Sequence, residues 1–343
     1  MIKLKKFIKL FILLSSILMI SCQTTNVLRM NNCTTNFKSQ SSIYYINSSP
    51  ESFQSRFLKF GMSLLGMKNR IAKAMQEGRG KQDADEPSRS LKKDFIFTIE
   101  TYKDRKIWTI APKQKNSEKV ILYLHGGAYI NNIIKYQWDM IEEIAIKTNA
   151  KIVVPDYPLA PESQYDKVYL FLESVYNDIL QQTKPENIIF LGDSAGGGLS
   201  LGLAQKLQVE KKLNPSQIIL IAPWLDITMS DPEIQKIDAF DKLLNVKGLI
   251  WAGEIYAGKQ SKLNSLISPI YGNLKGLGKI SIFIGTHDIL YADSLRLKKK
   301  LEENQISFHY FEYPKMFHVW PVIVGMQESD QAIDQISNLI VCD

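Results

Sequence analysis

The 343-residue sequence predicts an α/β fold, a doubly wound and mostly parallel sheet with antiparallel first strands and a helical cap. Two observations lead to this prediction. Between residues 119 and 285, short runs of apolar and largely β-branched residues recur, and stretches of helical period separate them. The runs are apolar throughout, which is typical of strands covered by helices on both faces. The composition, 45% hydrophobic and 22% charged, is that of an ordinary globular protein.

Residues 1–21 are expected to be a lipoprotein signal peptide. MIKLKKFIKL is basic, and the apolar LFILLSSILMI after it is too short for a bilayer span, which needs about 20 apolar residues. The segment ends in LMISC, which resembles a bacterial lipobox, although Met19 stands where Leu, Val or Ile is usual. We therefore expect Cys22 to carry fatty acyl chains such as palmitate and to anchor an exported protein to a membrane of the bacterial cell envelope. An uncleaved anchor, or ordinary secretion with an incidental cysteine, is the alternative.

Two further segments are expected before the main domain. Residues 22–48 are rich in Thr, Asn and Ser and are expected to form a flexible tether. Residues 49–90 are expected to form N-terminal helices, because large apolar residues recur there at steps of three and four. These residues are Phe53, Phe57, Phe60, Leu64, Met67, Ile71 and Met75. They either pack into the core or form a lid over an apolar pocket.

Residues 91–343 are predicted to form the α/β domain. Residues 94–102 and 105–111 alternate as an antiparallel pair of strands. The apolar runs that follow lie at 119–125, 150–157, 187–192, 217–223 and 279–285, and the helical patterns at about 134–149, 166–182, 194–209 and 291–304. The segment at about 227–265 has no strand signal and is expected to be a helical insertion between two strands. Ligands of such a sheet lie at the carboxyl ends of its strands.

Ser194 lies in a G-x-S-x-G pattern, Gly192-Asp193-Ser194-Ala195-Gly196, between a predicted strand and a predicted helix. No Lys-Ser or Lys-Thr pair follows the glycines, which excludes a phosphate-binding loop, and the spacing excludes a dinucleotide fingerprint. The pattern instead predicts a sharp turn that exposes a nucleophilic serine hydroxyl. A side chain at Gly192 or Gly196 would collide across so tight a turn. The following helix would direct its positive end at the site.

A nucleophilic serine needs a base, and the chain has four histidines. His318 follows the strand-like segment 306–313 in a loop that can reach the carboxyl edge of the sheet, and it is the preferred base. His287 adjoins the end of another strand and is the weaker candidate. His309 lies inside 306–313, where a side chain more often packs than reacts, and His125 ends a strand before two glycines.

The base in turn needs a carboxylate that orients it. Asp288 directly follows the strand at 279–285 and is the expected orienting residue, whereas Asp293 is expected to be the N-cap of the next helix. The resulting chain order, Ser194, Asp288 and then His318, is the order that α/β-hydrolases use.

HGGAY, which begins at His125, predicts the remaining part of such a site. Acyl transfer builds negative charge on a carbonyl oxygen, and backbone N–H groups must already point there. Gly126 and Gly127 allow the backbone to approach closely, and the N–H of Ala195 is expected to complete the oxyanion hole.

Charge and cysteine usage exclude other classes of function. The net charge is +7, but four of the lysines lie in the first nine residues, which leaves 7 − 4 = +3 for the rest and argues against a nucleic-acid partner. Apart from Cys22, only Cys33 and Cys342 remain, and neither lies near a histidine at ligand spacing. We therefore expect no metal site, and a disulfide between these two cysteines stays open.

Four motifs together resemble the hormone-sensitive-lipase family of α/β-hydrolase esterases: HGGAY, DYPLAPE at 156–162, GDSAGG and GTHDILYAD. The resemblance covers roughly residues 90–340. It implies an α/β-hydrolase catalytic domain and a serine carboxylester hydrolase that acts on a small-molecule acyl ester without a cofactor. It also implies a cap built from N-terminal residues and the insertion. The resemblance implies that Ser194 is the nucleophile, His318 the general base and acid, and Asp288 the orienting carboxylate. It also implies that the amides of Gly126, Gly127 and Ala195 form the oxyanion hole and that His125 braces the loop.

The sequence departs from the family pattern at two positions. Ala128 stands where many members have a third glycine, which is a common variant. Pro158 stands where arginine is usual, which removes an expected ion pair.

The same residues leave alternatives open. An acyltransferase, an amidase or a glycan deacetylase would use the same triad, and a catalytically inactive binding protein would use the same scaffold. The apolar cap residues suggest a pocket for short or medium acyl chains, or core packing alone; they are Phe53, Phe57, Phe60 and Met67 with Trp251 and Tyr256.

Overall fold

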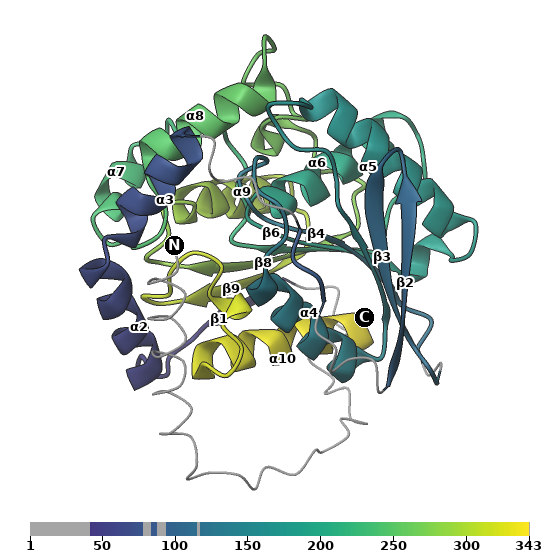
Figure 1. Ribbon diagram of the computed structural model, residues 1–343, viewed down its shortest axis with the longest axis horizontal. Coiled ribbons are helices and arrows are strands. Elements are labelled where there is room, and N and C mark those ends of the chain that lie inside the picture. Colours follow the sequence, from purple (N-terminus) through teal and green to yellow (C-terminus); the bar gives the residue numbers. More distant parts are fainter. Residues whose placement is uncertain (1–41, 78–83, 88–93, 115–116, 343) are drawn as a thin grey trace, which may run out of the picture. The chain divides into compact units, whose positions relative to one another are not determined.

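The computed structural model describes residues 42–77, 84–87, 94–114 and 117–342 (Figure 1). All of them belong to the second of two compact units, Thr35–Asp343, into which the chain divides. The predicted signal peptide, Cys22 and most of the predicted tether lie outside the described residues.

The described residues form a nine-stranded sheet with the order β1-β9-β8-β7-β6-β4-β5-β3-β2. The strands are β1 (Ile43–Ile46), β2 (Phe95–Tyr102), β3 (Arg105–Pro112), β4 (Val120–Leu124), β5 (Lys151–Pro155), β6 (Ile188–Asp193), β7 (Gln217–Ile221), β8 (Lys279–Gly285) and β9 (Phe308–Tyr313). The pairs β2–β3 and β3–β5 are antiparallel, and the other pairs are parallel. This confirms the predicted mostly parallel sheet with antiparallel first strands.

Helices cover both faces of the sheet, as predicted. They are α2 (Phe53–Leu64), α3 (Met67–Gln76), α4 (Lys135–Thr148), α5 (Tyr165–Leu180), α6 (Ala195–Val209), α7 (Glu233–Asp238), α8 (Val246–Ala257), α9 (Tyr291–Glu303) and α10 (Gln327–Cys342), with short 3₁₀ turns η2 (Pro185–Asn187), η3 (Pro269–Tyr271) and η4 (Trp320–Val322). Figure 1 shows α4 and α10 against one face and α5, α6 and α9 against the other. The core strands are fully buried, and side chains from both layers pack against them.

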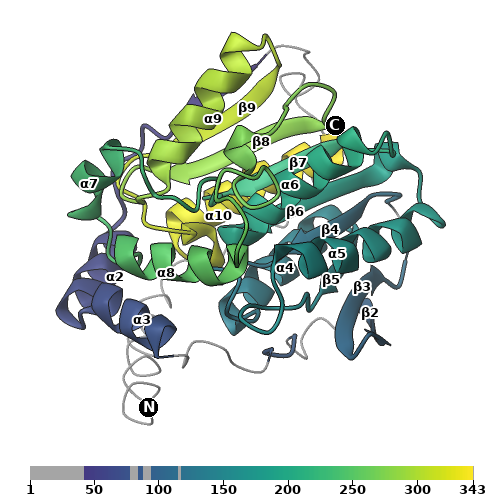
Figure 2. The same cartoon turned by 90° about the horizontal axis from the view of Figure 1, so that it is seen from above.

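The helical cap consists of two parts of the chain that lie side by side. The predicted insertion contains α7 and α8, and the predicted N-terminal helices are α2 and α3. In Figure 2, α3 lies beside α8, and the residue pair Gly248 and Ala72 makes this approach close. Lys68 on α3 also pairs with Asp238 at the end of α7, at 2.7 Å.

The prediction that residues 22–48 form a tether is wrong at its end, because Ile43–Ile46 forms β1. This strand pairs in parallel with β9, and Tyr45 packs on Phe311 and Tyr313 of that strand. Tyr44 and Ile46 on the other face remain exposed. The strand is short and lies between polar residues, so its alternation is weak in the sequence.

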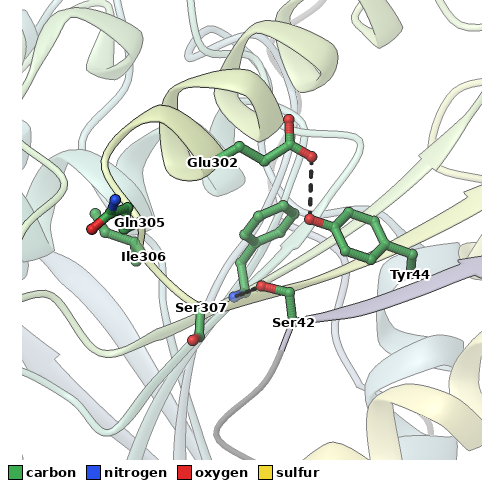
Figure 3. Close-up of a pocket in the computed structure, with 7 residues that line it drawn as sticks. Ser42, Tyr44, Glu302, Gln305, Ile306 and Ser307 are labelled. Atoms are coloured by element: carbon green, nitrogen blue, oxygen red, sulfur yellow. Dashed lines mark hydrogen bonds between the residues drawn. The ribbon is translucent and has the colours of Figure 1, made fainter.

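A cavity of about 320 Å³ lies at this edge of the sheet (Figure 3). Ser42, Tyr44, Glu302, Gln305, Ile306, Ser307 and Phe308 line it. The hydroxyl of Tyr44 donates to Glu302 at 3.1 Å, and Ser42 accepts a hydrogen bond from the Phe308 amide. These bonds fix β1 and Ser42 before it to the last turn of α9 and the first residue of β9. The cavity is separated from β6 by β9, β8 and β7, so it is not part of the site described below.

Candidate active site

Ser194 lies at the turn between β6 and α6, with φ of 52° and ψ of −119°. A positive φ is strained for a residue with a side chain, and such strain persists only where the surroundings enforce it. The surroundings here are two close backbone approaches. A Cβ at Gly192 would collide with the carbonyl group of Gly196, and a Cβ at Gly196 would collide with the carbonyl groups of Leu124 and His125. These glycines therefore let the turn bring Ser194 to the carboxyl edge of the sheet.

The structure brings Ser194, His318 and Asp288 together in one hydrogen-bonded chain. His318 Nε2 lies 2.9 Å from Ser194 Oγ, and His318 Nδ1 lies 2.8 Å from Asp288 Oδ2. Asp288 follows β8 and is fully buried, and its other oxygen accepts the Leu290 amide at 2.9 Å. His318 lies in the loop after β9, and its side chain is 10% exposed. With the proton on Nδ1, the imidazole donates to Asp288 and accepts from the serine hydroxyl.

The surroundings raise the pKa of His318. Burial alone would lower it, but the carboxylate of Asp288, by charge and by hydrogen bond, outweighs burial, with smaller contributions from Asp241 and Asp193. A carboxylate partner favours the imidazolium that forms when the serine proton is taken.

Asp193, inside the serine motif, is a residue that the sequence analysis did not assign a role. Its buried carboxylate accepts from the Tyr123 hydroxyl, from the Gly126 amide at 2.9 Å and from Gln137 Nε2 at 2.9 Å. Burial raises its pKa, and these donors offset part of that effect. Asp193 thus ties the end of β4 and helix α4 to the serine turn. Its place directly before the serine was the only signal in the sequence.

The structure corrects one of the predicted oxyanion donors. The Gly126 amide donates to Asp193, so this N–H is already engaged and holds the loop in place. The amide of Ala195, the first residue of α6, has no acceptor within its helix, as is usual at a helix N-terminus. Gly127 has a φ of 133°, and a Cβ there would collide with the carbonyl of Asn131. Gly127 and Ala195 therefore remain the candidate donors.

His125 contacts and supports the loop that carries Gly126 and Gly127. Its Nδ1 lies 2.8 Å from the Gly126 carbonyl oxygen, and its ring stacks on Tyr157 with centroids 4.2 Å apart. The Tyr157 hydroxyl donates to the His125 carbonyl at 2.6 Å. Burial lowers the pKa of His125 to about 4, so the ring is neutral near pH 7. Despite Pro158, Asp156 keeps an ion pair, which Arg105 on β3 supplies at 2.6 Å.

The other candidates lie outside this arrangement. His287 stacks on Phe240 in the cap insertion, and His309 is buried inside β9 near Ser281. The prediction that Asp293 caps α9 is wrong, because the N-cap is Leu290 and Asp293 lies in the first turn, where it pairs with Arg296 at 3.0 Å. The helix begins earlier than expected because the turn after Asp288 already has helical backbone angles.

Asp241, in the cap insertion, is a second carboxylate that the sequence analysis missed. One oxygen accepts the amides of Leu243 and Leu244 at 2.8 Å each, and the other accepts the Ile289 amide at 2.9 Å. Burial and the nearby charge of Asp288 raise the pKa of Asp241 to about 6. The cap is thus hydrogen-bonded to the residue that follows the orienting carboxylate.

The residues expected either to line an acyl pocket or to pack in the core lie in different surroundings. Tyr256 is fully buried and stacks on Tyr129 at 3.8 Å, close to the HGGAY loop. Phe53, Phe57 and Phe60 instead face outward, with 66%, 42% and 65% of their surface exposed. The opposite face of α2 carries the contacts to the body of the protein, so these rings do not enclose an acyl chain.

Comparison with known proteins agrees with this geometry. A family model described as alpha/beta hydrolase fold matches residues 121–322. An esterase of Acinetobacter venetianus is 29% identical over 65% of this chain and 75% of the relative. An acetyl-hydrolase of Streptomyces hygroscopicus is 27% identical over 59% of this chain and 68% of the relative.

Solved structures agree as well. An esterase/lipase from an uncultured bacterium superposes with a TM-score of 0.69 and 26% identity, covering 80% of this chain and 89% of the other. EstE5, soaked with p-nitrophenyl butyrate, gives a TM-score of 0.70 and 26% identity, covering 80% of this chain and 90% of the other. The chain therefore belongs to the α/β-hydrolase fold family, among the hormone-sensitive-lipase-like esterases, and is a serine carboxylester hydrolase.

Proposed function

We propose that Ser194 is the nucleophile, His318 the general base and acid, and Asp288 the orienting carboxylate of this hydrolase. The observation that carries the proposal is the continuous chain of contacts, 2.9 Å from Ser194 Oγ to His318 and 2.8 Å from His318 to Asp288. Both distances are within hydrogen-bond reach before any substrate binds.

The reaction follows from this geometry. His318 Nε2 takes the Ser194 proton as Oγ bonds to the ester carbonyl carbon, and the amides of Gly127 and Ala195 hold the resulting oxyanion. The ester C–O bond then breaks, and the alcohol leaves with the proton from His318. Water, deprotonated by the same imidazole, attacks the acyl-enzyme, and the acid leaves as Ser194 regains its proton.

We propose short- to medium-chain acyl esters as substrates. The relative from Streptomyces is named an acetyl-hydrolase, and EstE5 was soaked with a butyryl ester, which supports acyl groups of this size. The space behind the HGGAY loop is filled by the stacked rings of Tyr129, Tyr256 and Trp224, which favours a small acyl group over a long one.

A p-nitrophenyl ester series tests this proposal. Acetyl to octanoyl esters should be hydrolysed with a kcat/KM well above that of the palmitoyl ester, and Ser194→Ala should hydrolyse none of them. Equal rates from acetyl to palmitoyl would contradict the size preference. Because one relative is an acetyl-hydrolase, acetylated sugars belong in the same series, and faster release of acetate from them would favour the deacetylase alternative.

We further propose that the protein is a lipoprotein of the bacterial cell envelope, anchored through Cys22. The basic and apolar N-terminus and the LMISC sequence support this. Within the described residues, no helix is long and apolar enough to span a membrane. Radiolabelled palmitate fed to the cells should enter the wild-type protein and not the Cys22→Ser variant. Equal labelling of both would contradict the anchor.

A further inference from the structure

Helix α2 carries an apolar stripe on its outer face. Phe53, Phe60 and Leu64 are 66%, 65% and 74% exposed, and Phe57 between them is 42% exposed and stacks on Phe53. Their spacing of four, three and four residues places all of them within about 60° of arc around the helix. We call these four residues the α2 stripe. Large apolar side chains gathered in this way on a surface indicate a binding face.

The opposite face of α2 fixes the orientation of the helix. Ser55 is fully buried against Met316, and Leu58 and Met62 pack on the core. At the start of the helix, Ser52 donates from its amide and its hydroxyl to Glu328, at 2.7 and 2.8 Å. The helix therefore cannot rotate its stripe inward without losing these buried contacts.

The same contacts place α2 beside the loop that carries His318. Lys59 Nζ donates to the Lys315 carbonyl at 2.9 Å, and Glu328 lies just beyond that loop, at the start of α10. Figures 1 and 2 both show α2 and α3 at the cap side of the molecule, next to α7 and α8. A surface that binds the α2 stripe would therefore lie close to the loop that carries His318.

Two exposed cations, Arg56 and Lys315, lie on or next to α2. Arg56 is exposed on α2 within one turn of Phe53 and Phe60. Lys315 is exposed in the loop after β9, and its carbonyl oxygen accepts a hydrogen bond from Lys59 of α2. Lys59 itself is largely buried, with 12% of its side chain exposed, and it pairs with Glu51 at 2.5 Å. Within the described residues, neither Arg56 nor Lys315 has a carboxylate partner. Phenylalanine and leucine on one face, with arginine and lysine beside them, is the composition of helices that lie in a membrane interface.

We propose that the α2 stripe docks on an anionic lipid bilayer, with the four apolar side chains in the headgroup boundary and Arg56 and Lys315 on the lipid phosphates. The helix has 12 residues and is about 18 Å long, which is enough to lie flat in that boundary. A second copy of the chain would bring an identical set of cations against this one. The chain's own basic N-terminus, with four lysines in its first nine residues, would do the same. An anionic bilayer is the occupant that matches both the apolar stripe and the charge.

Fluorescence quenching in the full chain tests the contact directly, and it does not require ester hydrolysis. Phe60→Trp should be quenched by vesicles of phosphatidylcholine and phosphatidylglycerol with brominated acyl chains, and less by brominated phosphatidylcholine alone. Val209→Trp is the matched control, because Val209 is 77% exposed at the far end of α6, on the opposite edge of the sheet from Ser194. Trp108, Trp138, Trp224 and Trp320 are buried and give a constant background. The fifth tryptophan, Trp251 on α8, is only partly buried, so Trp251→Phe is included in both variants. Equal quenching of both variants, or of neither, would overturn the proposal.

Hydrolysis provides a second and independent measurement. The variant Phe53→Ser/Phe60→Ser/Leu64→Ser should lose about tenfold or more in rate on an ester dispersed in anionic vesicles and keep its rate on a water-soluble ester. Val209→Ser/Leu213→Ser, which removes exposed apolar residues elsewhere, should change neither rate. An equal loss on both esters would show a structural role for the stripe. Conversion of a wild-type dimer to a monomer by the triple substitution, measured by light scattering, would identify a second copy as the occupant. Either result would refute docking on lipid.

Discussion

Adding one methyl group at Gly196 tests how tightly the serine turn and the oxyanion loop are held together. A Cβ there would lie 2.5 Å from the Leu124 carbonyl carbon and 2.7 Å from the His125 carbonyl oxygen. Ordinary contact begins at 3.4 Å, so Gly196→Ala must move the end of β4 away from α6 by at least 0.9 Å. A misplacement of about 1 Å in a catalytic geometry costs about 10²-fold in rate. We therefore expect kcat on p-nitrophenyl butyrate to fall about 100-fold.

The matched control is Gly248→Ala on α8, where the nearest atom, Ala72 Cβ, would lie 3.3 Å away. This variant should keep kcat within about threefold, because its neighbour has to yield by only a few tenths of an ångström. Thermal unfolding should show Gly196→Ala folded, with a loss of stability of about 1–3 kcal/mol from overpacking. If Gly196→Ala is folded and as active as Gly248→Ala, the two backbones are not rigidly coupled and the reasoning is refuted.

Three further variants test the carboxylates around the triad. Asp288→Asn should lower kcat about 10⁴-fold, measured on the same ester, because His318 loses the partner that orients it; a loss under tenfold would contradict this role. Asp241→Asn removes a negative charge that raises the pKa of His318. Because activity requires neutral His318, the acid limb of the pH profile of kcat/KM should move to lower pH; an acid limb at the same or a higher pH would contradict this. Asp193→Asn leaves a buried donor without its acceptor and should lower the free energy of unfolding by denaturant by about 1–3 kcal/mol. Activity should fall as well, because the Gly126 amide is released. Unchanged stability would show that the carboxylate does not hold the loop.

The sequence predicts the fold and the serine turn well because their signals are local. Apolar runs and helical periods alternate along the chain, and the G-x-S-x-G pattern lies between a strand and a helix. His318 and Asp288 could be chosen because each follows a strand, and the carboxyl ends of parallel strands meet at one edge.

The remaining features depend on contacts between distant parts of the chain. The Gly126 amide is engaged by Asp193, 67 positions away, which no local pattern reveals. Helix α2 is apolar on two faces, with Leu58 and Met62 inward and the α2 stripe outward, so its period alone cannot say which face is buried. Asp241 lies in the insertion and meets Ile289 only through the packing of the cap.

The most direct measurement of the central claim is peptide mapping after reaction with a fluorophosphonate probe. The wild-type protein should carry one label per chain on the peptide that contains Ser194, and His318→Ala, while folded, should be labelled at least about 10³-fold more slowly. Labelling at another residue, or undiminished ester hydrolysis by Ser194→Ala, would contradict the assignment of this serine as the nucleophile.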